Sequence, residues 1–402
     1  MKVSAIICEY NPLHNGHVYH IRETRRNGAT HIICVLSSSF VQRGDVALLS
    51  KFDRARLAVK AGAALVIELP SPYSCAAAEV YASSGVALLN SLGVVDELSF
   101  GCTSGDMETI SLLTEAALST TQIYGARIRE RMAAGDSYPA AVWEIVRQRY
   151  GNLVAGMMTD PNNLLAIEYM KAMQRQNVRF KPFPVARLCV MHDSQETSGL
   201  YSSASFVRKM VADGDLSYTS FVPPYAAQLI SDRMMEGRTA FFEDLEPIIL
   251  FCLRTMTREQ LMELPDMNEA LANRFYAARN ANSTEEFLTQ VKTKCFTMAR
   301  IRRVLMSILL GLPKDVYRSI TPPYARVLAF SGRGREMLRD IQKMSTIPVN
   351  TSLAKLREEG GEAARFVQIE ERASHVYGLA QGIITSAEED FRARIILERA
   401  EK

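Results

Sequence analysis

The sequence predicts an α/β protein with a parallel sheet in its first half and a mainly helical second half. Short apolar strands alternate with helical segments from the start of the chain, as in proteins built on a parallel sheet. Strand signals stop after Val222–Tyr225, and the 402 residues are too many for one ordinary core. We therefore expect two domains, residues 1–221 and 222–402.

The first predicted strand leads into a turn that carries two histidines. An apolar run from Val3 predicts a buried strand, Asn11-Pro12 ends it, and a helical pattern begins at His17. The start of a helix offers unpaired N–H groups and the positive end of a dipole, which suit a phosphate. Gly16 allows the backbone to approach an anion, and His14 and His17 can donate hydrogen bonds to it. Taken alone, the motif is also compatible with a surface turn that carries incidental histidines.

Further strands and helices follow in alternation. The expected elements are a strand at 31–36, a helix from 51 towards 62 capped by Ser50, a strand at 64–67, a helix from about 76 to 89 and a strand at 98–100. The carboxyl ends of parallel strands lie at one edge of a sheet, where open α/β folds bind ligands. This places His14, His17, Gln42, Arg43 and Gly101 near one another.

A second candidate anion site lies near the end of the first half. Residues 106–144 show an apolar helical stripe that indicates packing, and Asp160-Pro161 predicts the start of another helix. After a strand predicted at 183–188, the segment from Ser202 to Arg208 combines hydroxyl groups, the N–H groups of a helix start and a guanidinium. An ordinary serine-capped helix is the alternative for this segment.

The second half contains a strongly basic run. Residues 290–343 hold twelve Lys and Arg against three Asp and Glu, a local net charge of +9 in a chain whose overall net charge is +3. Tyrosines lie within this run and an acidic segment follows it, which favours binding to a nucleic-acid backbone over a solvated helix face. The candidate residues are Lys292, Lys294, Arg300, Arg302, Arg303, Arg326, Arg333 and Arg335.

Composition restricts the compartment and the chemistry. The seven cysteines are widely spaced and form no C-x-x-C pair, so we expect reduced thiols in the core. Neither cysteines nor histidines cluster with the spacing of a zinc site, and we expect no metal ion bound by protein ligands. No apolar run approaches the length of a membrane span and no signal peptide is evident, which predicts a cytoplasmic protein with no membrane partner.

The two anion motifs together resemble the two signatures of the nucleotidylyltransferase-like superfamily, whose catalytic domain is Rossmann-like. Finer motifs also occur in register, at residues 9–17, 40–44, 68–70, 100–101 and 161–163. Over almost its whole length the chain is similar to the bacterial tRNA(Met) cytidine acetate ligase family. The resemblance implies that acetate and ATP form acetyl-adenylate with release of pyrophosphate. The acetyl group then passes to N4 of the wobble cytidine of elongator tRNA(Met), which gives N4-acetylcytidine.

The resemblance also implies roles for particular residues. His14 and His17 would be catalytic, and the basic run would bind the tRNA. ATP-binding residues would be Ile7, Cys8, Glu9, Tyr10, Asn11, Pro12, Leu13, His14, Asn15, Gly16, His17, Val18, Tyr19, His20, Gly101, Asn162, Asn163, Arg187, Ser202, Ser203 and Arg208. Which of the two asparagines contacts ATP stays open. The sequence Ser-Ser-Ala-Ser replaces the more usual Ser-Ala-Thr of relatives, and it keeps the hydroxyl groups.

Acetate is itself a carboxylate nucleophile, so the site needs donors and cations rather than a pair of carboxylates. Gln42, Arg43 and Lys51 are candidates for contact with acetate or phosphate, while ordinary surface roles remain equally open for the two cations. Mg²⁺ is expected to arrive with ATP. Two other functions remain: a small-molecule adenylyltransferase, which has no use for a long basic extension, and a non-catalytic RNA-binding protein, which does not need both histidines.

Overall fold

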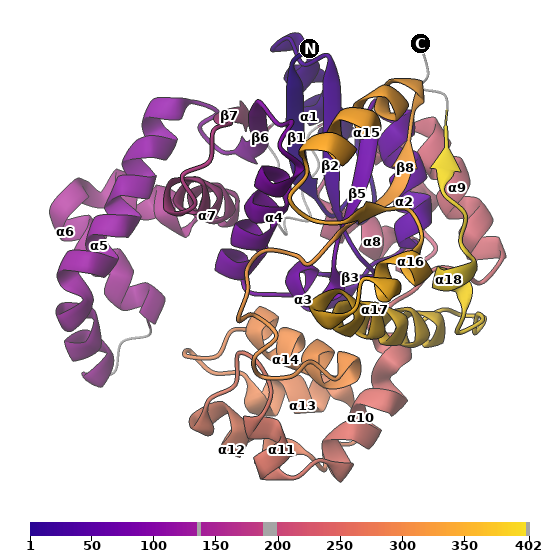
Figure 1. Ribbon diagram of the computed structural model, residues 1–402. Helices are drawn as coiled ribbons and strands as arrows, with labels where there is room; N and C mark the ends of the chain where they lie inside the picture. Colours follow the sequence, from indigo (N-terminus) through magenta and orange to yellow (C-terminus); the bar gives the residue numbers. More distant parts are fainter. Residues whose placement is uncertain (135–137, 188–198, 399–402) are drawn as a thin grey trace.

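A parallel sheet forms the centre of the protein, as the sequence predicts (Figure 1). The computed structural model describes residues 1–134, 138–187 and 199–398. From one side to the other, the parallel strands are β5 (Leu65–Leu69), β2 (His31–Ser37), β1 (Val3–Cys8), β6 (Glu97–Cys102) and β7 (Lys181–Ala186). Because the strand order reverses at β1, the carboxyl end of β1 is the expected place for a ligand.

Side chains of β1 alternate between two cores, one on each face of the sheet. Val3, Ala5 and Ile7 belong to one apolar cluster, whereas Ile6 and Cys8 belong to the other. The period of two in a strand produces this division, because successive side chains point to opposite faces. Both faces of the sheet are therefore buried, which explains why its strands appear in the sequence as continuous apolar runs.

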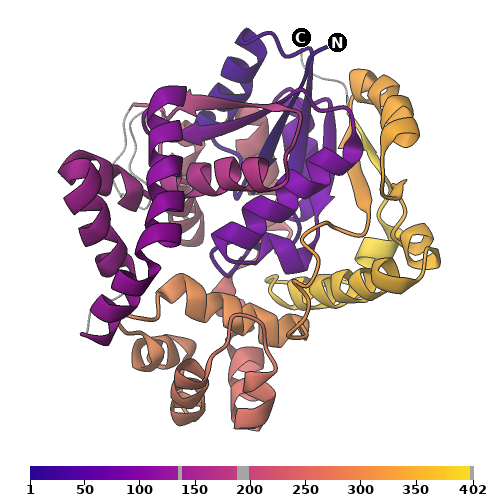
Figure 2. The same cartoon turned by 60° about the vertical axis from the view of Figure 1, so that its left-hand side comes forward.

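Most helices of the first half lie where the sequence predicts them. They are α1 (Asn15–Arg26), α2 (Lys51–Lys60), α3 (Ser71–Ser74), α4 (Ala78–Leu92), α5 (Met107–Ala133), α6 (Tyr138–Thr159), α7 (Pro161–Arg175) and α8 (Ala204–Ala212). As predicted, Asp160 caps α7 and Pro161 is its first residue. Helices α5 and α6 extend to one side of the sheet (Figures 1 and 2). The loop after β2 contains a short hairpin, β3 (Phe40–Val41) and β4 (Asp45–Val46), that the sequence did not reveal.

Helices dominate the second half, but it also contributes strands to the same sheet. The helices are α9 (Pro224–Met235), α10 (Glu246–Thr255), α11 (Arg258–Met262), α12 (Glu269–Ala278), α13 (Thr284–Val291), α14 (Met298–Leu310), α15 (Gly332–Met344), α16 (Leu353–Glu358), α17 (Gly361–Leu379) and α18 (Glu389–Arg392). Helices α10 to α14 lie together below the sheet, with α14 nearest to it (Figures 1 and 2).

The expectation that strands end before residue 222 is wrong. Strand β8 (Ala325–Phe330) pairs antiparallel with β5, and β9 (Val349–Asn350) and β10 (Ile396–Leu397) both pair with β8. A division at residue 221 therefore separates strands of one sheet. The sequence conceals β8 because its apolar run is short and is interrupted by a charged residue, Arg326.

A buried network of charges holds the second half against the sheet. The Nζ atom of Lys51 lies 2.5 Å from Glu68, 2.7 Å from Asp390 and 3.3 Å from Glu370, and Arg326 lies 2.6 Å from Asp390. These side chains are at most 4% exposed. Lys51 and Arg326 therefore contact neither acetate, phosphate nor tRNA, and both sequence-based assignments are wrong. Their partners lie up to 339 residues away in the chain, so local sequence could not reveal them.

The hydrogen bonds of this network indicate that one of its carboxyl groups is protonated below about pH 7. The hydroxyl oxygen of Ser38 lies 2.7 Å from a carboxyl oxygen of Glu68 and 2.7 Å from one of Glu370. A serine has a single hydroxyl proton, so two such hydrogen bonds require that one carboxyl group donates. Burial, reinforced by the neighbouring Glu68, raises the pKa of Glu370 to about 7, whereas the pKa of Glu68 is lowered. We infer that Glu370 donates to Ser38 and that Ser38 donates to Glu68.

Glu370→Gln should change how stability depends on pH. The pKa of Glu370 in the folded protein exceeds its ordinary value of 4.5, so the stability due to its proton is present below about pH 4.5 and is lost as the pH rises through 7. Glutamine can replace the neutral acid but does not titrate. In urea unfolding across this range, the free energy of unfolding of the wild type should fall relative to the variant as the pH rises. As a control, Glu358→Gln changes an exposed side chain, so the difference in free energy of unfolding between wild type and this variant should not depend on pH. If the difference for Glu370→Gln does not depend on pH either, Glu370 does not hold the proton.

Candidate functional site

A cavity of about 860 Å³ opens at the carboxyl ends of the central strands. It is lined by the histidine turn after β1, the β3–β4 hairpin, the ends of β6 and β7, and the first turns of α7, α8 and α14. The sequence predicts that the histidine turn, the loop with Gln42 and Arg43, and the end of β6 at Gly101 lie close together. The structure adds the first turn of α14 to this group. The cavity lies at the reversal of strand order that favours ligand binding in open α/β sheets.

The two histidines of the turn hold each other in place. His14 is the N-cap of α1, and its Nδ1 accepts a hydrogen bond from Gly16 N at 3.1 Å. The Nδ1 atom of His17 accepts from His14 N at 3.2 Å, and the two rings stack with centroids 3.6 Å apart. A neutral imidazole whose Nδ1 accepts carries its proton on Nε2. Burial and the neighbouring His14 lower the pKa of His17 well below its ordinary value, so His17 is a neutral donor.

Gly16 and Asn15 fix the shape of the turn. A Cβ atom on Gly16 would lie 2.9 Å from a ring carbon of His14, so only glycine allows this close approach. The side chain of Asn15 points away from the cavity lining and donates to the carbonyls of Leu200 and Ser220, at 2.9 and 3.1 Å. Asn15 thereby connects the histidine turn to the segments that flank α8.

The serine-rich segment lines the same cavity as the histidine turn. Ser203 is the N-cap of α8 and accepts from Phe206 N at 3.2 Å. Ser202, Ser203 and Arg208 all line the cavity, and Arg208 donates to Asp45 of the hairpin at 2.8 Å. The two anion motifs that the sequence predicts therefore face one cavity.

The two asparagines at the start of α7 have different environments, because only Asn162 lines the cavity beside the ends of β6 and β7. Gly101, Asn162 and Arg187 line the cavity, and the guanidinium of Arg187 hydrogen-bonds to the side chain of Asn162. Asn163 is fully buried away from the cavity lining. Its carboxamide oxygen accepts from Thr103 N and its amide donates to the carbonyl of Met157, both at 3.0 Å.

Other predicted residues fall into two groups. The remaining members of segment 7–20 that line the cavity are Ile7, Cys8, Glu9, Tyr10, Asn11, Tyr19 and His20, whereas Pro12, Leu13 and Val18 do not line it. Gln42 and Arg43 line it as well, and Gln42 N donates to Glu9 at 2.8 Å.

Sequence reasoning missed Arg54, which aligns the strand ends beneath the cavity. This fully buried side chain on α2 donates to the carbonyls of Glu9 at 2.8 Å, Ser37 at 2.9 Å and Leu49 at 3.0 Å. It therefore joins the carboxyl ends of β1 and β2. In the sequence Arg54 is one of several charged residues in a helical pattern, and no local signal marks it as buried.

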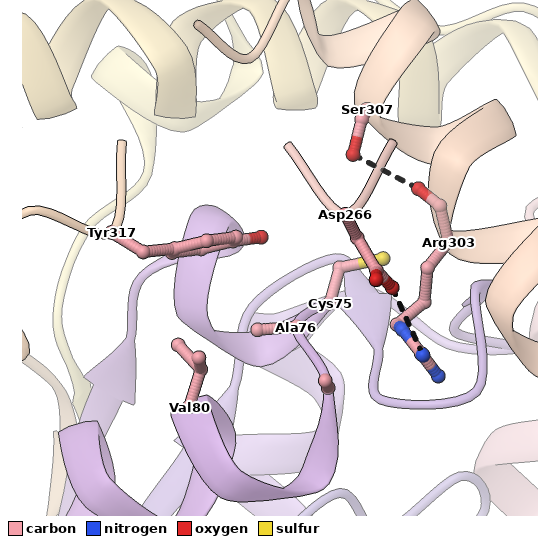
Figure 3. Close-up of a pocket in the computed structure, with 8 residues that line it drawn as sticks. Cys75, Ala76, Val80, Asp266, Arg303, Ser307 and Tyr317 are labelled. Carbon is pink, nitrogen blue, oxygen red and sulfur yellow. Dashed lines mark hydrogen bonds and ion pairs between the residues drawn. The ribbon is translucent and has the colours of Figure 1, made fainter. Parts of the chain in front are cut away.

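The candidate tRNA-binding residues lie in different parts of the structure and do not form one surface. Arg302 lines the cavity, whereas Arg300 and Arg303 form ion pairs with Asp266, at 3.1 and 3.2 Å. Arg303 borders a second, smaller cavity on the other side of α14 (Figure 3). Lys292 and Lys294 are exposed in the loop before α14. Arg333 and Arg335 are exposed on α15, and Arg333 lies near His31 at the amino end of β2, on the opposite edge of the sheet.

The cavity carries an excess of positive charge. Its charged lining consists of four arginines, at positions 43, 187, 208 and 302, and two carboxylates, Glu9 and Asp45. Within the described residues, no group of three or more His, Cys, Asp and Glu side chains is arranged to hold a metal ion. Neutral histidine donors beside a cationic wall suit a polyanion whose charge grows during reaction. Of the described cysteines, four are buried and all are free, and Cys189 lies outside the described residues.

Comparisons with known proteins identify the family. A model of the HIGH nucleotidyl transferase family matches residues 1–390. The tRNA(Met) cytidine acetate ligase of Acetivibrio thermocellus is 35% identical over 370 residues, which cover 88% of this chain and 89% of that protein. The one from Caldanaerobacter subterraneus subsp. tengcongensis is 33% identical over 402 residues, 98% of this chain and all of that protein. The chain belongs to the tRNA(Met) cytidine acetate ligase family.

Membership of this family makes the chain an enzyme of the ligase class. A solved structure of Thermotoga maritima TmcAL bound with alpha-thio ATP superposes with a TM-score of 0.91 at 25% identity, and the match covers all of both chains. Its apo form gives a TM-score of 0.93. The predicted nucleotidyltransferase fold is thereby confirmed. None of the helices in the described part of the chain is both long and apolar enough to cross a membrane.

Replacing the two asparagines should give different results. Asn162→Ala should weaken ATP binding with little loss of stability, because Asn162 lines the cavity. Asn163→Ala should lower the free energy of unfolding by about 1–3 kcal/mol, because two buried backbone groups lose their partners. Equilibrium dialysis with ATP and urea unfolding measure the two effects. Loss of stability in Asn162→Ala without loss of ATP affinity would reverse the assignment.

Proposed function

We propose that this enzyme uses ATP and acetate to acetylate N4 of the wobble cytidine in elongator tRNA(Met). An acetate oxygen attacks the α-phosphorus of ATP, the bond to the β-phosphate breaks, and pyrophosphate leaves. The N4 amine then attacks the carbonyl carbon of acetyl-adenylate, AMP leaves, and the amine proton passes to water. The observation that carries the proposal is the convergence of both anion motifs on one cavity in a chain of this family.

Each wall of the cavity has a role in this proposal. His14 and His17 donate hydrogen bonds to the phosphate oxygens where negative charge grows, and Ser202, Ser203 and Arg208 hold the departing pyrophosphate. Gly101, Asn162 and Arg187 hold the nucleoside end of ATP, together with the lining residues of segment 7–20. Gln42 and Arg43 are proposed contacts for acetate or phosphate. Mg²⁺ would enter with ATP and offset part of the phosphate charge.

Neutral histidines suit the first step. Their N–H groups need no change of protonation as charge develops, and burial strengthens each hydrogen bond. Acetate requires no general base because it is already ionised at neutral pH. Glu9 lines the same cavity, but its Oε1 already accepts from Gln42 N.

Exposure and ion pairing support a smaller tRNA-binding surface than the sequence predicts. Lys292 and Lys294 are exposed in the loop that leads to Thr297, and Thr297 lines the cavity. RNA bound at these lysines would lie beside the acetyl-adenylate. Arg300 and Arg303 are held by Asp266, and Arg333 and Arg335 lie on the far edge of the sheet, so we leave all four outside the proposed surface.

The proposed activity can be tested with labelled acetate. The protein is incubated with ATP, labelled acetate and bulk bacterial tRNA, and the RNA is digested to nucleosides. Label in N4-acetylcytidine is the expected result. Pyrophosphate release that requires a small phosphorylated acceptor, without labelled RNA, would instead indicate a small-molecule adenylyltransferase.

His14→Ala and His17→Ala should each reduce acetate-dependent exchange of pyrophosphate into ATP by about 10²–10³-fold, the effect expected for removing one donor to a developing negative charge. His31→Ala provides a control, because His31 lies at the opposite edge of the sheet. Circular dichroism should show an unchanged fold for all three variants. Exchange rates near the wild-type value in both active-site variants would rule out the proposed roles.

Lys292→Ala combined with Lys294→Ala should weaken tRNA binding and make it less dependent on salt. Each lost phosphate contact reduces the slope of log affinity against log salt concentration by about 0.7–0.9. Arg333→Ala combined with Arg335→Ala removes the same charge from the far edge of the sheet and should leave the slope unchanged. The opposite pattern would move the tRNA surface to α15. Acetate-dependent pyrophosphate exchange, which needs no tRNA, should be the same in both double variants.

A further inference from the structure

Three polar atoms on one wall of the large cavity lack a partner. The Nε atoms of Arg208 and Arg302 and the hydroxyl of Ser202 are buried and have no hydrogen-bond partner among the described residues. All three side chains line the cavity. Leaving a buried donor unpaired is costly, so native proteins rarely leave several of them close together. Two guanidinium groups and a hydroxyl that line one cavity provide a place suited to an anion.

Arg302 is the unexpected member of this group, because it comes from α14 in the second half of the chain. Its guanidinium lies 3.9 Å from the centroid of the buried Phe242 ring, which fixes the plane of the side chain. Its ion pairs are long, at 3.7 Å to Asp45 and 3.8 Å to the exposed Glu243. Contacts of this length near water contribute little. Arg302 therefore keeps most of its capacity to bind an anion.

Asp45 lies between two guanidinium groups. Its Oδ2 atom is 2.8 Å from Arg208 and 3.7 Å from Arg302. Burial would raise the pKa of Asp45, but the two arginines outweigh burial and hold it below its ordinary value. The carboxylate is therefore ionised and neutralises one of the two cations. One positive charge remains on this wall for a ligand.

The backbone holds Arg302 firmly beside the hairpin. Gly44, at φ +73°, joins β3 to β4, and a Cβ atom on it would lie 2.3 Å from the backbone nitrogen of Arg303. The hairpin that carries Arg43 and Asp45 thus packs directly on the backbone of α14. Arg302 keeps a fixed position relative to both of them, as a binding group requires.

We propose that Arg302 is an anion-binding residue of the large cavity, and that its guanidinium donates to an anionic oxygen of either the acetate carboxylate or an ATP phosphate. The inference rests on the proposed function, whose active site it extends into the second half of the chain. It also places Arg302, expected from the sequence to bind tRNA, among the residues that act on the small substrates.

The test compares Arg302→Gln with Arg300→Gln. The two arginines share the first turns of α14 and are similarly exposed, with side chains 24% and 26% exposed, but Arg300 pairs with Asp266 and does not line the cavity. ATP affinity is measured by equilibrium dialysis, and acetate dependence by pyrophosphate exchange without tRNA. Arg302→Gln should raise either the dissociation constant of ATP or the KM for acetate by about 10–100-fold. Arg300→Gln should change neither.

The results identify the anion. A higher KM for acetate with unchanged ATP binding identifies the carboxylate, whereas weaker ATP binding identifies a phosphate. Arg302→Lys keeps the charge but lacks the planar fork of guanidinium donors, and it should restore only part of the loss. It serves as the second variant if Arg302→Gln fails to fold. Unchanged values for the folded variants, beside an active wild type, would overturn the inference, whereas a wild type without acetate-dependent exchange would overturn the proposed function.

Discussion

Most of this structure depends on the buried network in which Lys51 and Arg326 form ion pairs with Glu68 and Asp390, with Glu370 beside them. They join a helix and a strand of the first half to a strand and two helices of the second half. Removing so many charges from water is costly, and the network is stable only because every charge has a partner. The proton on Glu370 completes this balance, since it leaves two cations facing two carboxylates. Such a network specifies one docking of the two halves, because any other arrangement would bury unpaired charge.

This docking decides where α14 lies. Strand β8 follows α14 in the chain and is held against β5, so the helix is confined below the carboxyl edge of the sheet. Its first turn lines the large cavity together with the histidine turn. A cavity that a nucleotide-binding sheet would leave open is thereby completed by residues from the second half. The second half thus helps to line this cavity, and it carries exposed lysines in the loop that leads to Thr297.

The cavity contains two kinds of hydrogen-bond donor, neutral histidines and charged arginines. The histidine turn supplies a neutral donor in His17, whose pKa is lowered by burial, and backbone N–H groups fix the orientation of both rings. The arginines supply permanent charge, and the carboxylate of Asp45 lies between Arg208 and Arg302 and offsets part of their mutual repulsion. Neutral donors respond to charge that develops during reaction, whereas fixed cations bind charge already present in the substrates.

The sequence by itself determined the elements whose signals are local. The strand, turn and helix around His14, the cap and proline of α7, and the serine cap of α8 depend on contacts within a few residues, so propensity and spacing predicted them.

Tertiary structure alone decided the roles of the charged residues. Lys51, Arg54, Arg302 and Arg326 are alike in sequence, as cations in or near helices and strands. Two lie in a buried network, one joins strand ends, and one faces the cavity. Their partners are distant in the chain, and the pKa and the function of a charged group depend on burial and on those partners. Only the folded chain brings both into place.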